Sequence, residues 1–236
     1  LNASGPAPKS LSVAALKDRG FEKIPSYGVE PIDVPGAVAG WMTLHERFGK
    51  LPLEEVMAPA IRYAEKGYPV TPNISRLWQE AFENYSKYRD RPEFQGWFDT
   101  FAPNNTWLKP GEMFRCPDMA KTLKEIAATK GEAFYRGAIA EKIDAFFKKH
   151  NGFLTKEDLA AFKPEWVDPI SVNYHGVDVW ELPPNGHGIT VLMALQILKD
   201  MNLAERDCAD TMHKQIEAMK LAMVDTAEYV AEPSFM

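Results

Sequence analysis

Cysteine and long hydrophobic runs are scarce in this sequence. Only two cysteines occur in 236 residues, and Cys116 and Cys208 lack the spacing of a metal-binding pair. The pattern favours two free thiols over one disulfide and leaves the redox compartment open. No segment offers the ~20 consecutive apolar residues that a membrane-spanning helix requires, so a membrane is not an expected partner.

Positive charge is outweighed by negative charge. The chain has 27 Lys and Arg against 33 Asp and Glu, which gives a formal net charge of −6. The basic residues are scattered, and no basic run is interleaved with aromatic residues, so nucleic acid is not an expected partner. The cluster Lys148, Lys149 and His150 is interpreted as the solvated end of a helix.

The sequence motifs of common enzyme classes are absent as well. The chain has no G-x-G-x-x-G after a strand, no Walker loop, no H-E-x-x-H, no C-x-x-C and no G-x-S-x-G. None of its five histidines stands at a ligand spacing from another. The sequence therefore predicts no cofactor, no metal site and no complete catalytic centre on this chain.

The chain is large enough for one large domain or two small ones, and its 45% of hydrophobic residues can fill a core. Residues 1–236 are interpreted as a single segment, mainly helical over 1–165, with a strand pair, a turn and two helices over 166–236. Because Leu1 replaces an initiating Met, the segment is interpreted as a fragment or processed piece. Its location, cytoplasmic or periplasmic and secreted, is left open.

Apolar residues recur at helical spacing through most of the first 165 residues. Helices are predicted over 11–19, 36–48, 53–66, 74–88, 118–129 and 138–149. The second half of 72–110, residues 89–110, is predicted to be rich in loops. Asp118 is predicted to cap its helix, and Thr155 with Asp158 forms a near capping box.

The last helix is predicted over 209–230. One stripe of its surface is apolar, with Met212, Ile216, Met219, Met223 and Val230. His213, Glu217 and Lys220 follow another face, where an acid–base pair is one interpretation and an exposed salt-bridged face is the favoured one.

The chain's most informative segment runs from a strand into a helix through a glycine-rich turn. Strands are predicted over 170–174 and 177–182, with a turn at His175 and Gly176. Pro183 and Pro184 end the second strand. Gly186 is expected to provide backbone freedom or close approach.

Gly188 is expected to serve in the same way, just before a helix whose free amides can meet a ligand's negative charge. An ordinary strand-to-helix turn is an equally good interpretation of this composition. His187 stands inside the turn and would either donate a hydrogen bond to a substrate carboxylate or carbonyl, or bond the local backbone.

Several separated stretches together resemble the γ-glutamyltransferase family of the N-terminal-nucleophile (Ntn) hydrolase superfamily. They are residues 34–41 (VPGAVAGW), 44–52 (LHERFGKLP), 58–67 (APAIRYAEKG), 133–137 (AFYRG), 154–160 (LTKEDLA), 183–188 (PPNGHG) and 216–222 (IEAMKLA). Their order and spacing over about residues 34–235 make the match specific. The opening residues 1–5 (LNASG) look like the γ-glutamyltransferase-like branch of the family.

The resemblance implies an α+β fold, the helix-rich large-subunit part of an α-β-β-α sandwich that is incomplete without a small subunit. It also implies that the two subunits arise by self-cleavage of one precursor, and it leaves open a higher oligomer of such heterodimers. In this family the new N-terminal Thr of the small subunit is the nucleophile, and its α-amino group is the base. No catalytic residue is therefore expected in this chain; Leu1 cannot act as the nucleophile, and Thr190 is internal.

Two departures from the family pattern concern the substrate, a small-molecule amide. Alignment places Ser4 where γ-glutamyltransferases carry an Arg that binds the substrate's α-carboxylate, and Ser cannot supply that bidentate charge. The turn reads Pro-Asn-Gly-His-Gly instead of Pro-Ser-Ser-Gly-Gly. The residues predicted to bind substrate are Ser4, Asn185, Gly186, His187 and Gly188.

Three functions are thus open. The first is a γ-glutamyltransferase-like enzyme that transfers or hydrolyses an acyl amide. The second is an amidase for another small acid amide or an acylase of the cephalosporin type, suggested by Ser4 and His187. The third is a non-catalytic scaffold that retains the fold.

Overall fold

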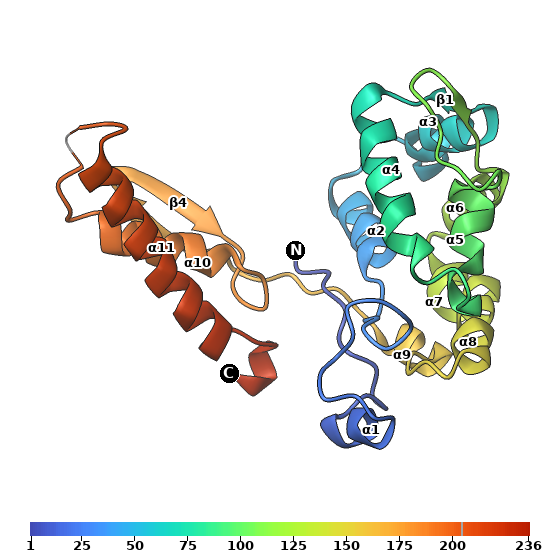
Figure 1. The fold of residues 1–236 in the computed structure, drawn as a ribbon, viewed down its shortest axis with the longest axis horizontal. Helices are drawn as coiled ribbons and strands as arrows, with labels where there is room; N and C mark the ends of the chain where they lie inside the picture. Colours follow the sequence, from blue (N-terminus) through green and yellow to red (C-terminus); the bar gives the residue numbers. More distant parts are fainter. Residues whose placement is uncertain (204) are drawn as a thin grey trace. The chain divides into compact units, whose positions relative to one another are not determined.

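A computed structural model describes residues 1–203 and 205–236. The chain divides into two compact units (Figure 1). We call residues 5–163 the helical unit, and Leu1–Ser4 together with Pro164–Met236 the hairpin unit. Leu1–Ser4 belong to the hairpin unit although they lie far from its other residues in the sequence. No local sequence pattern indicates this grouping.

The helical unit consists of short helices and one small strand pair. Its elements are α1 (Val13–Asp18), α2 (Ala37–Phe48), α3 (Leu53–Lys66), β1 (Tyr68–Pro69), α4 (Pro72–Ser86), η1 (Pro92–Phe94), α5 (Gln95–Phe101), β2 (Met113–Phe114), α6 (Pro117–Thr129), α7 (Glu132–Arg136), α8 (Ala138–Lys149) and α9 (Lys156–Ala161). Strands β1 and β2 pair antiparallel. The predicted bounds are confirmed to the residue for α3 and α8, and within two residues for α1, α2 and α4.

One local prediction in this unit is incomplete and another is wrong. Residues 89–110 are rich in loops, but they also contain η1 and α5. Proline opens η1, and Phe94 and Phe98 are buried among neighbouring aromatic rings, so packing stabilises a helix that composition disfavours. Asp118 does not cap α6, because Pro117 occupies the first turn and Cys116 takes the cap position.

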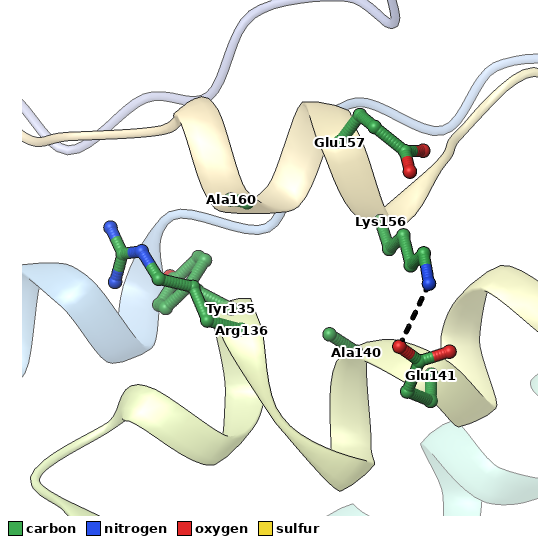
Figure 2. A pocket seen from close by; sticks show the side chains of 7 residues that line it. All are labelled: Tyr135, Arg136, Ala140, Glu141, Lys156, Glu157 and Ala160. Atoms are coloured by element: carbon green, nitrogen blue, oxygen red, sulfur yellow. Dashed lines mark hydrogen bonds and ion pairs between the residues drawn. The ribbon is translucent and has the colours of Figure 1, made fainter.

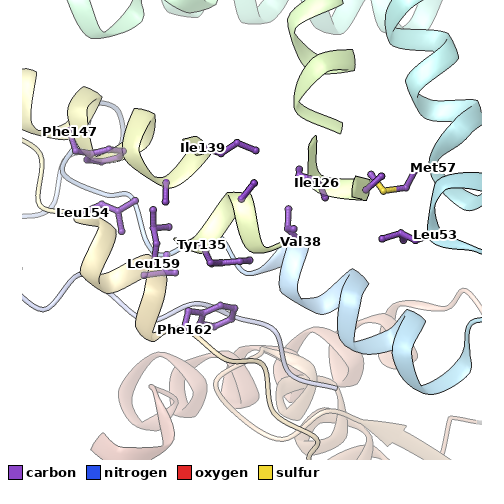
Figure 3. Packing of buried hydrophobic residues seen from close by; sticks show 14 of the residues in the cluster. Val38, Leu53, Met57, Ile126, Tyr135, Ile139, Phe147, Leu154, Leu159 and Phe162 are labelled. Carbon is purple, nitrogen blue, oxygen red and sulfur yellow. The ribbon is translucent and has the colours of Figure 1, made fainter. Parts of the chain in front are cut away.

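The core of the helical unit lies between α2, α3 and the α6–α9 region (Figure 3). Leu154 and Leu159 are almost completely buried there. The Tyr135 hydroxyl donates to the Pro35 carbonyl oxygen at 2.7 Å and accepts from the Ala39 amide at 3.0 Å. Burial raises the pKa of this hydroxyl. Tyr135 therefore ties α7 to the start of α2.

The capping box at the start of α9 is confirmed. The Thr155 hydroxyl accepts from the Asp158 amide, and the Asp158 carboxylate accepts from the Thr155 amide at 3.0 Å. Asp158 also accepts from the amide of Lys9 at 3.1 Å. One buried carboxylate thus satisfies backbone donors that lie far apart in the sequence, since Lys9 is 149 residues from Asp158.

The hairpin unit contains β3 (Ile170–Tyr174), β4 (Val177–Glu181), α10 (Gly188–Leu198), α11 (Ala209–Tyr229) and η2 (Pro233–Phe235). The predicted hairpin is confirmed. Val172 pairs with Val179, and His175 and Gly176 turn the chain with positive φ values of 51° and 87°. Such values match the right-handed twist of a two-residue hairpin. The hairpin packs on α10, and α10 packs along α11.

The apolar stripe predicted on α11 does not form its buried side. Helix α11 contacts α10 through small residues, and the buried ones are Thr211, Ala218, Ala222 and Thr226. Met212, Ile216, Met219 and Met223, which we call the methionine stripe, are exposed. Small side chains allow the two helix axes to approach closely, so the larger residues remain outside.

Other polar features of α11 agree with the sequence. Glu217 and Lys220 form an ion pair at 2.8 Å, which supports the exposed salt-bridged face over an acid–base pair.

Cys116 and Cys208 are both free thiols. Within the part of the chain that the structure describes, no helix is long and apolar enough to cross a membrane.

Candidate functional site

The glycine-rich turn connects the end of β4 to the start of α10. His187 occupies the position before the first helical residue, but its side chain does not cap the helix. A methyl group at Gly188 would collide with the side chain of Glu181, so this glycine permits the close approach that the sequence predicts. Gly186 differs, because a Cβ there would meet nothing within 4 Å. The fold therefore requires glycine at position 188 but not at position 186.

Asn2 links the N-terminal residues to this turn. Its backbone pairs with Glu165, with N···O distances of 2.8 Å in both directions. Its side-chain amide donates to Oδ1 of Asn185 at 3.0 Å, and its own Oδ1 accepts from the Ser4 amide at 3.0 Å. Two of the predicted substrate-binding residues, Ser4 and Asn185, are thus brought to one place by a single side chain.

The five predicted residues differ in their exposure to solvent. Ser4, Gly186 and His187 are exposed, whereas Asn185 and Gly188 are half-buried. In the described part of the chain, the imidazole of His187 makes no hydrogen bond, so the interpretation in which it bonds the local backbone has no contact to support it. His187 is available to a ligand.

The predicted residues at this turn include no Lys or Arg, and an acidic side chain lies beside them. That side chain is Glu181, whose carboxylate lies against Gly188 at the start of α10. Amide and hydroxyl groups can orient an acyl group by hydrogen bonding, but they cannot neutralise a carboxylate as an arginine does. Among the residues described, no three His, Cys, Asp or Glu side chains gather as metal ligands.

Two residues at this site were missed in the sequence. Asn2 follows the first residue of the chain, and its link to Asn185 spans 183 positions. Its only local signal is the preference of Asn for bonding a backbone amide two residues on, as it does with Ser4. Glu181 ends a strand, and nothing in the sequence says that its side chain folds back onto residue 188.

An apolar groove of about 420 Å³ lies elsewhere in the hairpin unit, between β3, α10 and α11. Its lining is Ile170, Ser171, Val172, Ile189, Leu192, Met193, Gln196, Ile197, Ala222 and Asp225. None of the predicted substrate-binding residues is among them. This groove is therefore a separate feature, suited to apolar contact rather than to polar recognition.

The helical unit has a pocket of about 260 Å³ between α7, α8 and α9 (Figure 2). Lys156 reaches across to Glu141 at 2.9 Å (Figure 2). Arg136 pairs with Glu132 at 2.8 Å. Glu157 lines the same pocket, and within the described part of the chain its carboxylate forms no ion pair (Figure 2). The pocket is lined by residues from the motif at 133–137 and from the motif at 154–160. Residues of both motifs also belong to the core of the helical unit, so we assign both motifs to packing.

Comparison with known proteins identifies the family. The family model described as gamma-glutamyltranspeptidase matches residues 1–236, the whole chain. This chain belongs to the gamma-glutamyltranspeptidase family. A glutathione hydrolase proenzyme from Pseudomonas aeruginosa is 33% identical over 97% of the chain. The chain spans only 41% of that relative's length.

Solved structures of family members share the fold. A cephalosporin acylase from Bacillus halodurans superposes with a TM-score of 0.96 and is 52% identical, covering 99% of this chain and 44% of its own. Helicobacter pylori gamma-glutamyltranspeptidase gives a TM-score of 0.88 at 27% identity, covering 100% of this chain and 68% of its own. The expected α+β fold class and the family resemblance are both confirmed.

Proposed function

We propose that this chain is the large-subunit part of an enzyme that hydrolyses or transfers the acyl group of a small amide. The observation that carries the proposal is the match of the whole chain to the gamma-glutamyltranspeptidase family, together with its coverage of less than half of a related proenzyme. In this proposal the nucleophile is an N-terminal Thr on a small subunit cut from the same precursor.

The chemistry follows from an N-terminal nucleophile. The Thr hydroxyl attacks the amide carbonyl while its own α-amino group takes the proton. The resulting ammonium group gives that proton to the nitrogen of the amide, and the amine then leaves the tetrahedral intermediate to form the acyl-enzyme. Water or a second amine then accepts the acyl group. The role proposed for this chain is to bind and orient the acyl part, with Ser4, Asn185 and His187 donating hydrogen bonds to its oxygen atoms.

A non-glutamyl acyl donor is the second candidate, and the electrostatics of the turn favour it. A γ-glutamyl group carries an α-carboxylate, and the turn presents neither Lys nor Arg to it, while the Glu181 carboxylate lies nearby. The similarity to a protein described as a cephalosporin acylase, at 52% identity, supports the same choice. An acyl group without an α-carboxylate would avoid both the missing cation and the repulsion.

A docked second polypeptide is supported by the apolar outer surface of the hairpin unit. The methionine stripe is exposed along α11, with Ile216 at 56% and Met223 at 59% of their full accessibility. The groove between β3, α10 and α11 is also mostly apolar. Surfaces of this kind in a soluble protein mark interaction sites. We assign the stripe and the groove to the remainder of the proenzyme, the proposed small subunit.

The proposed activity is tested on the full-length gene product. Mass spectrometry should show two chains, and purified protein should release p-nitroaniline from acyl anilides. Side-by-side assays of γ-glutamyl-p-nitroanilide and of anilides whose acyl group lacks the α-carboxylate separate the two candidates. Faster turnover of the second group supports the acylase. A product that is neither cleaved nor active supports the non-catalytic scaffold.

The docking assignment is tested by adding charge to the stripe. Ile216→Glu should reduce co-purification of the two processed chains, because a carboxylate would be buried without a partner. His213→Glu on the polar face of α11 adds the same charge and is the matched control. Equal loss in both variants, or in neither, contradicts the assignment.

A further inference from the structure

The side chain of Asn2 makes two hydrogen bonds of opposite sense. Its Oδ1 accepts from the Ser4 backbone amide at 3.0 Å, and its Nδ2 donates to Asn185 Oδ1 at 3.0 Å. Its own backbone is held by the two 2.8 Å bonds to Glu165. Asn2 is half-buried, so its orientation is set by these partners rather than by solvent.

The backbone amide of Ser4 fixes the direction of both hydrogen bonds made by the Asn2 side chain. A backbone N–H can only donate, so the Ser4 amide must meet the oxygen of the Asn2 side chain. The NH₂ group of Asn2 then points to Asn185. Because that NH₂ group cannot accept, Asn185 must turn its own oxygen toward it. The NH₂ group of Asn185 is left over.

We propose that Asn2 is a positioning residue that makes Asn185 present a hydrogen-bond donor, rather than an acceptor, to the acyl group of the substrate. The proposal rests on the proposed function and deepens it by naming what the site accepts: a carbonyl or other oxygen acceptor. The Glu181 carboxylate beside Gly188 and the absence of Lys and Arg from the predicted residues favour an uncharged oxygen over a carboxylate as this acceptor.

Asn2→Asp tests the proposal because it changes one NH₂ group to oxygen at constant shape. The introduced carboxylate still accepts from Ser4, but it has nothing to donate, so Asn185 must reverse its amide and present oxygen to the ligand. In the full-length processed enzyme, KM for the acyl donor should rise about tenfold, as expected for a lost hydrogen bond replaced by repulsion. The value of kcat, self-cleavage and the melting temperature should change little.

Ala3→Asp is the matched control for charge, because it adds a carboxylate one residue away without removing the donor to Asn185. Its KM should stay close to that of the wild type. An equal rise of KM in both variants shows a charge effect and overturns the proposal. A parallel loss of kcat, self-cleavage and melting temperature in Asn2→Asp shows a structural role and also overturns it.

A pH profile gives a further readout that a structural role would not move. As the pH falls toward about 4, the carboxyl group introduced by Asn2→Asp becomes protonated and regains an O–H donor. The KM of this variant should therefore fall toward the wild-type value measured at the same pH. Ala3→Asp should show no such recovery relative to the wild type. A constant ratio of KM between Asn2→Asp and wild type across this range contradicts the proposal.

The amide of Asn185 can also be observed without any activity. In protein labelled with ¹⁵N-asparagine, the Asn185 side-chain NH₂ signal is assigned by its loss in Asn185→Asp. Its protons should exchange freely with water in the wild type and become protected in Asn2→Asp, where they bond the introduced carboxylate. Protection in the wild type overturns the proposal. If the wild type lacks amide hydrolysis, the proposed function fails, while this measurement still decides the orientation of Asn185.

Discussion

Leu154 and Leu159 of the helical unit are almost fully buried, whereas the hairpin unit buries mainly small residues such as Ala218 and Ala222. The helical unit surrounds a continuous cluster of large side chains (Figure 3). In the hairpin unit, α11 buries only Ala and Thr, α10 adds the buried Leu192 and Leu198, and the methionine stripe stays exposed. The two units therefore obtain their stability in different ways.

The two units differ in the size of the side chains that they bury, and not in whether they expose apolar residues. The helical unit also exposes apolar residues, including Trp41, Leu44 and Phe48 on one face of α2, but it has a buried cluster behind them. In the hairpin unit, the larger apolar residues of α11 are themselves on the outside. The helical unit has the core of an independent folding unit, and the hairpin unit has the surface of a component.

The largest expected effect comes from removing a side chain from the core of the helical unit. Leu159→Ala should lower the free energy of unfolding by about 2–5 kcal/mol, because it leaves a cavity at a site with no solvent exposure. Leu221→Ala in the hairpin unit removes the same atoms from an exposed position and is the matched control, with an expected change within about 0.5 kcal/mol. Urea denaturation measures both, and similar losses would erase the contrast between the units.

The next effect tests what holds α10 to α11. The Thr226 hydroxyl donates to the Ala222 carbonyl oxygen at 2.7 Å, so the Thr190 hydroxyl must donate to Thr226, also at 2.7 Å. Thr226→Val should cost about 1–3 kcal/mol, because it leaves the buried Thr190 hydroxyl without an acceptor. Thr190→Val keeps the Thr226 donor satisfied and should cost less. A double-mutant cycle by thermal unfolding measures the coupling, and its absence contradicts a polar link between the helices.

A smaller effect concerns acid stability of the helical unit. The hydrogen bond from Lys148 lowers the pKa of Asp144, with a further contribution from the Lys156 amide. The stabilisation is therefore complete above the unfolded pKa of about 3.9 and is lost as the pH falls through the lower folded pKa. Asp144→Asn should cost up to about 1 kcal/mol at pH 7 and should lack this part of the acid dependence. Equal dependence of the free energy of unfolding on pH in the variant and the wild type would contradict this contribution of Asp144.

The smallest effect is expected for a substitution in the methionine stripe. Met223→Ser removes a large apolar side chain from the methionine stripe, yet it should change the stability of this chain alone by no more than about 0.5 kcal/mol, since the residue is exposed. Met57→Ser, at a buried position of α3, is the matched control and should be strongly destabilising. Comparable losses in calorimetry would show that the stripe belongs to a core.

Local structure was well predicted where the signals are local. The bounds of α3 and α8, the hairpin turn at His175 and Gly176, and the capping box at Thr155 depend on side chains and backbone within a few residues. Helix α5 was missed because Phe98 is buried in an aromatic cluster to which another segment contributes, with Phe82 of α4 against its ring. Periodicity does not contain that information.

The candidate site could be predicted in part. The family resemblance pointed to the turn and to Ser4, and the structure links Ser4 to Asn185 through Asn2. The exposure of the methionine stripe could not be predicted, because periodicity identifies an apolar face but not the surface that faces it. Small residues on a neighbouring face of α11 provided the closer contact with α10.

The family, the α+β class, most helix bounds and the position of the glycine-rich turn could all be inferred before folding was considered. These depend on ordered motifs and on interactions between residues close in the chain. The groups that meet at the turn and the apolar face that stays exposed depend instead on contacts between residues far apart in the chain. Asn2 and Asn185 are 183 positions apart, and the orientation of an amide pair depends on a donor that only the folded backbone supplies.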